Sequence, residues 1–248
     1  MKTYALTHRG LVRRENQDRF LVKEFPGAVL VALADGMGGH AGGEIAAQTA
    51  VDALEGFDPE SSECLDALME KIRAADLAVK KVAMEDSSLK SMGTTLTAAF
   101  VRDLTAHWVH VGDSRLYLLR QGHFIQITDD HTLPGFLLKE GEISREEARV
   151  HPLRNALLSC IGCGKLEGEG GTLDLEAGDL LLLSSDGLHD GVPEEAIADI
   201  LNSKHRIEEK LDALVDAALS AGGRDNITVV GVQMSFHRGE HHSRKRAG

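Results

Sequence analysis

The stretch that most constrains the fold is an apolar run that ends abruptly at an aspartate. Residues 29–34 carry no polar side chain, and the run is followed by Asp35-Gly36-Met37-Gly38-Gly39-His40. Such a run predicts a strand that is buried on both faces, with Asp35 emerging from the core into a cleft. The glycines allow a sharp bend and a close backbone approach to a ligand. A carboxylate beside an exposed carbonyl suits Mg²⁺ or Mn²⁺, although an ordinary glycine-rich turn has the same local pattern.

The composition is that of a globular protein with excess negative charge. The chain has 248 residues, of which 42% are hydrophobic and 27% charged, and this length suits one large domain or two small ones. The formal net charge of −12 argues against a nucleic-acid-binding surface, because such surfaces attract phosphates with Lys and Arg. The charge fits a protein that gathers cations or basic partner segments, and it also fits simple solubility.

The N-terminal residues and the cysteines bear on the cellular compartment. The first residues lack the apolar core of a signal sequence, and no apolar run is long enough to cross a bilayer. We therefore expect a cytoplasmic protein, or the cytoplasmic face of something larger. The odd set of Cys64, Cys160 and Cys163 predicts reduced thiols. Cys160 and Cys163 form a lone CxxC without the second pair of a structural zinc site, so zinc or redox chemistry is the less favoured interpretation.

Periodicity divides the chain into helical and strand segments. Apolar stripes at helical spacing occur in 47–54, 65–82, the segment that begins at Pro193, and 207–218. Strand patterns occur in 3–8, 19–22, 94–101, 107–111, 116–119, 124–127, 172–175, 179–183 and 227–232. Several of these strands follow one another without helices between them, which predicts antiparallel sheet.

Two segments interrupt this pattern. Residues 132–165 mix Pro and Gly with short helical pieces, and Ser144 with Glu147 matches a capping box. An irregular insertion of this length is typical of a lid or substrate-binding flap. Residues 237–248 are basic and rich in His, and we interpret them as a disordered, solvated tail, with metal binding by its histidines as the less favoured alternative. Residues 1–236 then form a single domain.

Aspartates recur at the ends of apolar runs or at strand turns. They are Asp18, Asp35, Asp113, Asp186 and Asp225. If the sheets bring these positions together, the carboxylates repel and raise one another's pKa values unless divalent cations intervene. Two such ions can hold a bridging water, lower its pKa and direct it at phosphorus.

Two further side chains fit such a reaction. Arg13 lies in the polar turn before the second strand, where its guanidinium could grip phosphate oxygens or simply be solvated. His40 could protonate the departing alcohol oxygen.

A set of short motifs between about Arg9 and Val232 resembles the metal-dependent protein serine/threonine phosphatase family, PP2C or PPM, in its compact bacterial form. The motifs are Arg13-Arg14-Glu15-Asn16-Gln17-Asp18, Asp35-Gly36-Met37-Gly38-Gly39-His40, Gly93-Thr94-Thr95, Gly112-Asp113-Ser114-Arg115, Thr128-x-Asp130-His131, Ser185-Asp186-Gly187 and Asp225-Asn226. Each motif is weak alone, but their joint occurrence in the family's order is specific. Departures are His189, where a threonine is common, and the glycine-rich segment 168–171, which we interpret as a linker; neither is expected to touch the site.

The resemblance implies an α+β fold, a four-layer α-β-β-α sandwich with two antiparallel sheets around a binuclear metal cleft and helices outside. It also implies roles for individual residues. Asp35 would bridge two ions, the Gly36 carbonyl would serve the second, Asp186 and Asp225 would hold the first, Asp113 with Asp186 would form a third position, Asp18 would act through water, Arg13 would bind phosphate, and His40 would be the general acid. The flap would be 132–165.

The implied function is that of a protein serine/threonine phosphatase that uses Mn²⁺ or Mg²⁺. Its partners would be phosphorylated proteins, the substrates of a cognate bacterial Ser/Thr kinase, and we expect a cytoplasmic monomer that binds neither nucleic acid nor membrane. No C-x5-R phosphate loop and no G-x-x-x-x-G-K-[ST] motif occurs, which argues against a cysteine phosphatase and a P-loop NTPase. The remaining alternative is a catalytically silent module of this fold that binds a partner.

Overall fold

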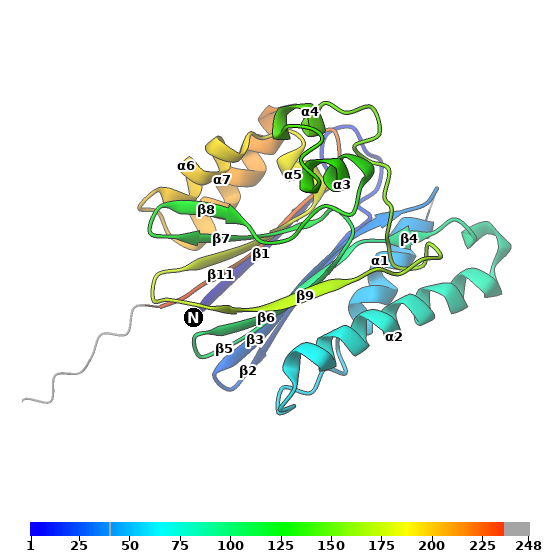
Figure 1. The fold of residues 1–248 in the computed structure, drawn as a ribbon, viewed down its shortest axis with the longest axis horizontal. Coiled ribbons are helices and arrows are strands. Elements are labelled where there is room, and N and C mark those ends of the chain that lie inside the picture. Colours follow the sequence, from blue (N-terminus) through cyan, green and yellow to red (C-terminus); the bar gives the residue numbers. More distant parts are fainter. Residues whose placement is uncertain (40, 236–248) are drawn as a thin grey trace, which may run out of the picture.

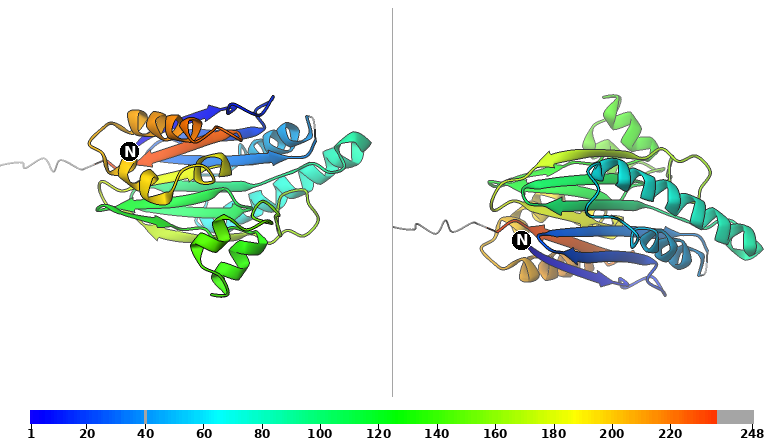
Figure 2. Two further views of the ribbon diagram at one scale, coloured as in Figure 1. Left: turned by 90° about the horizontal axis from the view of Figure 1, so that it is seen from above. Right: turned by 90° about the horizontal axis from the view of Figure 1, so that it is seen from below.

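The protein is a stack of two antiparallel sheets with helices on both outer faces (Figures 1 and 2). A computed structural model describes residues 1–39 and 41–235. The first sheet has the order β1 (Lys2–His8), β11 (Ile227–Gln233), β10 (Leu180–Ser184), β7 (Arg115–Arg120) and β8 (His123–Gln126). The second has the order β2 (Asp18–Phe25), β3 (Ala28–Met37), β5 (Leu96–Arg102), β6 (Thr105–Val111) and β9 (Glu169–Asp174), with β4 (Gly93–Thr94) paired to β3. The predicted α+β four-layer sandwich is confirmed.

The helices fall into three groups. The second sheet is covered by α1 (Gly42–Asp52) and α2 (Cys64–Glu85), which η1 (Ser87–Leu89), a 3₁₀ helix, follows. The first sheet is covered by α5 (Asp186–His189), α6 (Glu194–Asn202) and α7 (Ile207–Ser220). The segment between β8 and β9 carries α3 (Leu133–Lys139) and α4 (Arg145–Arg149). In the described part of the chain, we find no helix with the length and apolarity that a membrane span requires.

Strand β3 lies at the centre of the packing, as its apolar sequence predicts. Leu30 and Ala32 face the helices that cover the second sheet, whereas Val29 and Val31 face the other sheet. Each of these side chains is at most 1% exposed. The strand is therefore buried on both faces along these positions, and Asp35 lies further along the same strand, near its carboxyl end.

Strand β9 begins earlier than the sequence indicates. Its predicted start is residue 172, but pairing with β6 already begins at Glu169. The glycines that make this segment look like a linker instead accommodate the tryptophan of β6. A β-carbon at Gly171 would lie 3.0 Å from the Trp108 ring, which is itself 9% exposed.

The irregular segment 132–165 is tied to the body at its base. An isolated bridge between Thr132 and Leu157 closes the part of the segment from 132 to 157, and a second bridge joins Ile161 to Thr94. The predicted capping box opens α4, because the Ser144 hydroxyl accepts from the Glu147 amide and the Glu147 carboxylate accepts from the Ser144 amide. Both α3 and α4 therefore lie in a loop that a backbone bridge closes at its base.

The cysteines differ from the prediction of reduced thiols. Cys160 and Cys163 are joined in a disulfide with their Cα atoms 5.4 Å apart, while Cys64 is buried with a free thiol. The odd count gave no information on which cysteines lie together. Gly162, which lies between the two cysteines, has a φ of +85°.

Candidate active site

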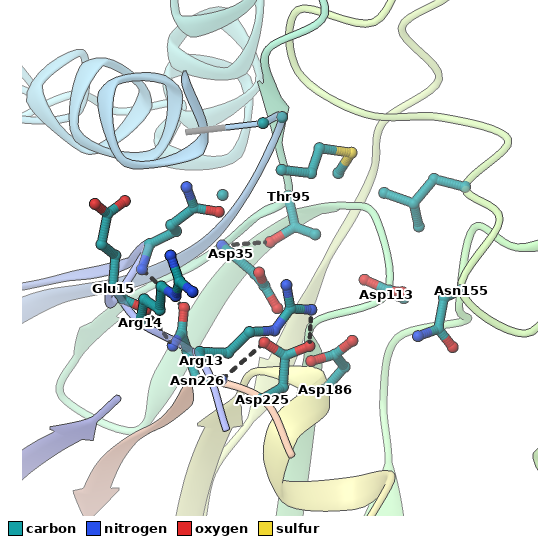
Figure 3. A pocket seen from close by; sticks show the side chains of 16 residues that line it. Arg13, Arg14, Glu15, Asp35, Thr95, Asp113, Asn155, Asp186, Asp225 and Asn226 are labelled. Atoms are coloured by element: carbon teal, nitrogen blue, oxygen red, sulfur yellow. Dashed lines mark hydrogen bonds and ion pairs between the residues drawn. The ribbon is translucent and has the colours of Figure 1, made fainter. Parts of the chain in front are cut away.

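Carboxylates from separate parts of the chain line one cleft of about 630 Å³ (Figure 3). Asp35 lies near the end of β3, Asp113 follows β6, Asp186 begins α5 and Asp225 precedes β11. Asp18 is the first residue of β2 and pairs directly with Asp35. The two sheets end at this edge, so the predicted convergence of these side chains is observed.

The backbone at Gly36 is held tightly between neighbouring segments. A β-carbon there would lie 2.1 Å from the Gly43 carbonyl oxygen and 2.7 Å from that of Gln17. On the other side, the Asp35 carbonyl accepts hydrogen bonds from the Thr94 hydroxyl at 2.8 Å and from the Thr95 amide at 3.0 Å. Only glycine fits this position, and the backbone of Asp35 and Gly36 is held by neighbouring segments on both sides.

Asp18 is held beneath the cleft floor. Its side chain is 2% exposed, and Oδ2 accepts hydrogen bonds from the hydroxyls of Ser185 at 2.8 Å and Thr228 at 2.7 Å. Among the described residues, Oδ1 of Asp18 and Oδ1 of Asp186 have no hydrogen-bond partner. Buried acceptors without donors are costly, so both oxygens are candidates for coordination to a cation.

The electrostatics of the cleft also favour the binding of cations. Burial, and then repulsion from Asp18 and Asp186, hold the pKa of Asp35 well above its ordinary value. Burial, and then the charges of Asp113 and Asp225, do the same to the pKa of Asp186. Burial raises the pKa of Asp113 to about 7 and that of Asp18 to about 6. Carboxylates that are this costly to ionise together fit a site for divalent cations, since oxygen ligands of negative charge are what Mg²⁺ and Mn²⁺ take.

A cationic side chain forms an ion pair with this cluster. The Arg13 guanidinium donates to Oδ2 of Asp225 at 2.6 Å, and its side chain is 54% exposed. Arg13 thus lies at the mouth of the cleft, where phosphate oxygens would enter, but it is paired with a carboxylate in this structure.

Asn226 holds the N-terminal turn, residues 9–17, against the site by hydrogen bonds. Its Nδ2 donates to the carbonyls of Arg9 and Glu15, both at 2.9 Å, and its Oδ1 accepts from the Gln17 amide at 2.8 Å. The sequence shows only an Asp-Asn pair before a strand and assigns no role to the amide. The Asn226 side chain therefore connects the segment that carries Asp225 to the turn that carries Arg13.

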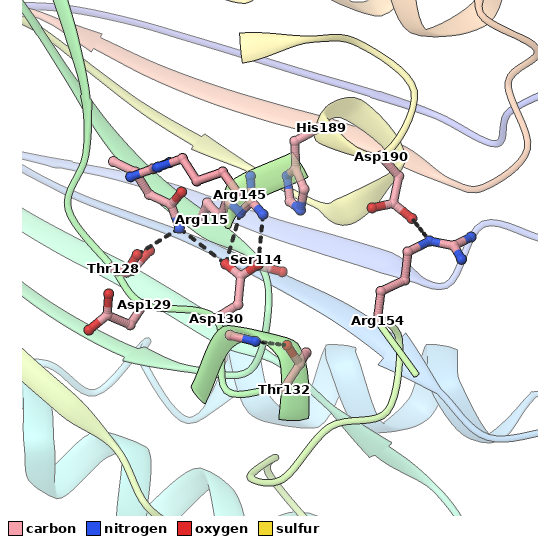
Figure 4. Close-up of polar contacts among 12 residues, drawn as sticks. Ser114, Arg115, Thr128, Asp129, Asp130, Thr132, Arg145, Arg154, His189 and Asp190 are labelled. Carbon is pink, nitrogen blue, oxygen red and sulfur yellow. Dashed lines mark hydrogen bonds and ion pairs between the residues drawn. The ribbon is translucent and has the colours of Figure 1, made fainter. Parts of the chain in front are cut away.

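A second cavity of about 550 Å³ adjoins the cleft, and both are lined by Asp113 and Asp186. Its wall holds Arg115, which binds both oxygens of Asp130 at 2.8 and 2.7 Å (Figure 4). His189 also lines it, so this departure from the family pattern lies closer to the carboxylates than the sequence predicts. The reason is helical geometry, because α5 presents His189 one turn after Asp186.

The turn before Asp113 is braced by two histidines that sequence reasoning did not single out as site residues. His110 hydrogen-bonds through Nδ1 to the Thr97 hydroxyl at 2.8 Å and through Nε2 to the Gly112 carbonyl at 3.0 Å. The Gly112 amide donates to Nδ1 of His131 at 3.2 Å. With Glu169 these histidines are spaced closely enough to hold a metal ion. Both ring nitrogens of His110 are already engaged, however, so the cluster positions the Asp113 turn.

Not every predicted site residue can be compared with the structure. Arg13, Asp18, Asp35, Gly36, Asp113, Asp186 and Asp225 all lie at or beneath the cleft described above. His40, the candidate general acid, and the predicted tail 237–248 lie outside the described residues.

Comparison with known proteins gives consistent matches. A family model, Protein phosphatase 2C, matches residues 8–221. The serine/threonine protein phosphatase PstP of Mycobacterium tuberculosis is 41% identical over 228 residues, which cover 91% of this chain and 43% of PstP. The serine/threonine phosphatase stp of Listeria monocytogenes is 40% identical over 235 residues, covering 92% of this chain and 93% of stp. The chain thus spans less than half of PstP but nearly all of stp.

Solved structures agree with these relatives. A crystal structure of M. tuberculosis PstP has a TM-score of 0.87 and 39% identity, covering 95% of this chain and 99% of that one. A structure of the PstP catalytic domain in complex with two manganese ions has a TM-score of 0.84 and 37% identity, covering 94% of this chain and 98% of that one.

Proposed function

The chain belongs to the protein phosphatase 2C family of serine/threonine protein phosphatases, and on this premise we propose that it hydrolyses phosphoserine and phosphothreonine monoesters of proteins. The observation that carries the proposal is the cleft in which Asp35, Asp113, Asp186 and Asp225 converge, with a buried carboxylate oxygen of Asp186 left without a partner among the described residues. Such a cleft disfavours an anionic substrate unless cations bind first, so the proposed enzyme depends on divalent metal ions, Mn²⁺ or Mg²⁺.

We assign the ligands as follows. Asp35, the Gly36 carbonyl, Asp186 and Asp225 would hold two ions, Asp113 with Asp186 would provide a third position, and Asp18 would act from beneath the cleft. The chemistry that two bound cations supply is activation of a water for in-line attack at phosphorus and neutralisation of the phosphate charge. The raised pKa values of Asp35 and Asp186 support this assignment, because a cation relieves the repulsion that causes them.

The chain's own side chains bind and orient the substrate. Arg13 grips two phosphate oxygens by its fork of N–H donors, and to do so it must leave Asp225, to which it now donates at 2.6 Å. Cation binding at Asp225 would favour that release by taking up the same carboxylate. Asn226 holds the turn of Arg13 through the Glu15 carbonyl and thereby limits how far the arginine can move. His40 is proposed as the acid that protonates the leaving alcohol oxygen.

The finer setting is also proposed. The substrates would be phosphoproteins made by a cognate bacterial Ser/Thr kinase, and the enzyme would act in cytoplasmic signalling as a monomer. Residues 1–236 would be the phosphatase domain, 132–165 its flap and 237–248 a tail outside it. The alternative of a catalytically silent binding module has no support in the site, since no expected ligand among the described residues is replaced.

The test is hydrolysis of a phosphothreonine peptide by the purified chain with Mn²⁺, with Mg²⁺ and with chelator. We expect turnover only with metal. Asp35→Asn should lower kcat by about a hundredfold or more, as loss of an essential electrostatic group does, while the circular dichroism spectrum is retained. Asp199→Asn, at an exposed position of α6, is the matched control and should leave kcat unchanged. Activity that persists in chelator, or full activity of Asp35→Asn, would refute the mechanism.

A further inference from the structure

The disulfide between Cys160 and Cys163 lies at the end of the segment 132–165, and the proposed reaction makes no use of it. The two cysteines differ in exposure. Cys160 is 4% exposed, whereas Cys163 is an exposed residue. A CxxC pair with one exposed and one buried cysteine is suited to thiol–disulfide exchange, since a soluble thiol reaches the exposed cysteine first.

The residues between the cysteines are hydrogen-bonded to the segment that pairs with the metal site. Ile161 and Thr94 exchange backbone hydrogen bonds, 3.0 Å from the Thr94 amide and 2.8 Å from the Ile161 amide. Thr94 in turn lies opposite Gly36 in the β3–β4 ladder, and its hydroxyl donates to the Asp35 carbonyl. One strand of two residues, β4, therefore separates the disulfide loop from Asp35 and Gly36.

Sγ of Cys163 lies against the backbone of that same strand. A β-carbon at Gly93 would lie 2.4 Å from Sγ of Cys163 and 3.1 Å from the Ile161 carbonyl oxygen. Two bonded sulfurs are only about 2 Å apart, so two thiols need more room than the disulfide occupies. Because Cys160 is buried and the Gly93 backbone lies close to Sγ of Cys163, the direction open to a reduced Cys163 is outward, away from β4.

Helix α2 holds the loop independently of the disulfide. Asp76, which is 5% exposed, accepts from the Gly162 amide at 2.9 Å and from Nζ of Lys80 at 2.7 Å. Lys80 also donates to the Gly164 carbonyl at 3.0 Å. None of these contacts uses a sulfur atom, so reduction leaves their donors and acceptors in place to hold the loop.

We propose that Cys160–Cys163 is a reversible thiol–disulfide exchange site whose oxidation state sets the affinity of the adjoining carboxylate cleft for divalent cations. The ligand class is a dithiol reductant or, in reverse, a disulfide oxidant. One thiolate of the dithiol attacks Sγ of Cys163, the bond between the protein sulfurs breaks, and Sγ of Cys160 takes the electron pair and a proton. The second thiolate attacks the reductant's own sulfur and releases Cys163 as a thiol. The protein gains two electrons and two protons, and the dithiol becomes a disulfide.

The coupling follows from packing. With the disulfide closed, β4 is backed by Cys163 and holds Asp35 and Gly36 in one arrangement; with the thiols apart, that backing is lost. Coupling between two sites is reciprocal, so if oxidation tightens cation binding by some factor, the cation favours the disulfide by the same factor. We expect a factor of about fivefold or more, at the lower end of typical couplings. This second half of the proposal rests on the proposed metal site, whereas the exchange chemistry does not.

The exchange is tested by counting thiols in the full chain after equilibration in glutathione buffers of graded ratio, quenched with maleimide in denaturant. The chain has three cysteines, so the count should pass reversibly from one adduct to three as the buffer becomes reducing. Cys64→Ser should pass from none to two at the same buffer ratio. A count of three in every buffer, or a count that never rises with reductant, would overturn the exchange site.

The coupling is tested by repeating the titration with Mn²⁺ and by measuring Mn²⁺ binding calorimetrically for the oxidised and the reduced chain. The redox midpoint should shift toward the disulfide with Mn²⁺, and the Mn²⁺ dissociation constant should rise by the same factor on reduction. Cys163→Ser should bind Mn²⁺ as the reduced chain does and ignore the reductant. Equal affinity in both states would overturn the coupling. A reversible thiol count without any phosphatase activity would instead refute the proposed function and leave the exchange site standing.

Discussion

Replacing one buried acid of the cleft should stabilise the protein when metal is absent. The substitution is Asp18→Asn, at a side chain that is 2% exposed and directly opposite Asp35 in the ladder. In the wild type, the ionised Asp18 is buried near other carboxylates. An amide removes that charge, keeps an acceptor for the hydroxyls of Ser185 and Thr228, and offers a donor where Oδ1 now has no partner among the described residues.

The magnitude follows from the pKa. Burial raises the pKa of Asp18 from 3.8 to about 6, although the hydroxyl hydrogen bonds lower it in part. Each pKa unit corresponds to about 1.4 kcal/mol, so ionising Asp18 in the folded state costs about 3 kcal/mol. The folded state holds its proton when the unfolded chain has released it. The free energy of unfolding therefore falls as the pH rises from about 4 to about 6, and the loss is complete above that range. Asp35, Asp113 and Asp186 act with the same sign.

The assay is urea unfolding of chelated protein across this pH range. Wild type should lose stability as the pH rises, and Asp18→Asn should lose about 3 kcal/mol less. Asp199→Asn, an exposed control on α6, should follow the wild type. Saturating Mn²⁺ should abolish most of the wild-type loss, because a ligand that binds only the folded state stabilises it. If chelated wild type gained stability over this range, or if Asp18→Asn had the wild-type slope, the repulsion we infer would not exist.

Two further substitutions examine the ends of the cleft. Gly36→Ala forces a β-carbon to 2.1 Å from the Gly43 carbonyl and should cost about 1–3 kcal/mol in urea unfolding. Gly39→Ala, where the β-carbon meets no atom within 4 Å, should cost less, and equal costs would contradict the packing argument. Arg13→Ala removes both the competitor for Asp225 and the proposed phosphate ligand. It should tighten Mn²⁺ binding in calorimetry while raising KM for a phosphopeptide by about tenfold, and weaker Mn²⁺ binding would refute the competition.

The fold could be predicted from the sequence where local pattern and tertiary packing agree. The run at 29–34 is apolar at every position, and β3 is indeed buried on both faces. Prediction was wrong where the choice of residue depends on a contact with a segment distant in the chain. Gly170 and Gly171 were interpreted as part of a linker because glycine favours turns. They belong instead to β9, where they make room for Trp108 of the neighbouring strand.

In the site too, some features could be predicted from the sequence and others could not. Aspartates at strand ends were visible in the sequence, and strand ends meet at a sheet edge, so their convergence could be expected. The role of Asn226 could not, because its partners Arg9 and Glu15 are more than 200 residues away in the chain. The cysteine pair was misjudged for a different reason. The number of cysteines indicates the usual redox compartment of a protein, but it does not show which cysteines lie together in the fold, as Cys160 and Cys163 do here.

The charge balance of the cleft connects stability to function. Against the carboxylates of Asp35, Asp113, Asp186 and Asp225, the described lining of the cleft provides one guanidinium in ion-pair contact, that of Arg13. That guanidinium is the group that substrate phosphate would require. In the metal-free cleft it is paired with the Asp225 carboxylate instead. Cations that replace Arg13 at Asp225 would therefore stabilise the fold and free the arginine in a single step. A chain with these contacts should bind metal and substrate in that order, because the reverse order leaves an anion facing carboxylates that nothing neutralises.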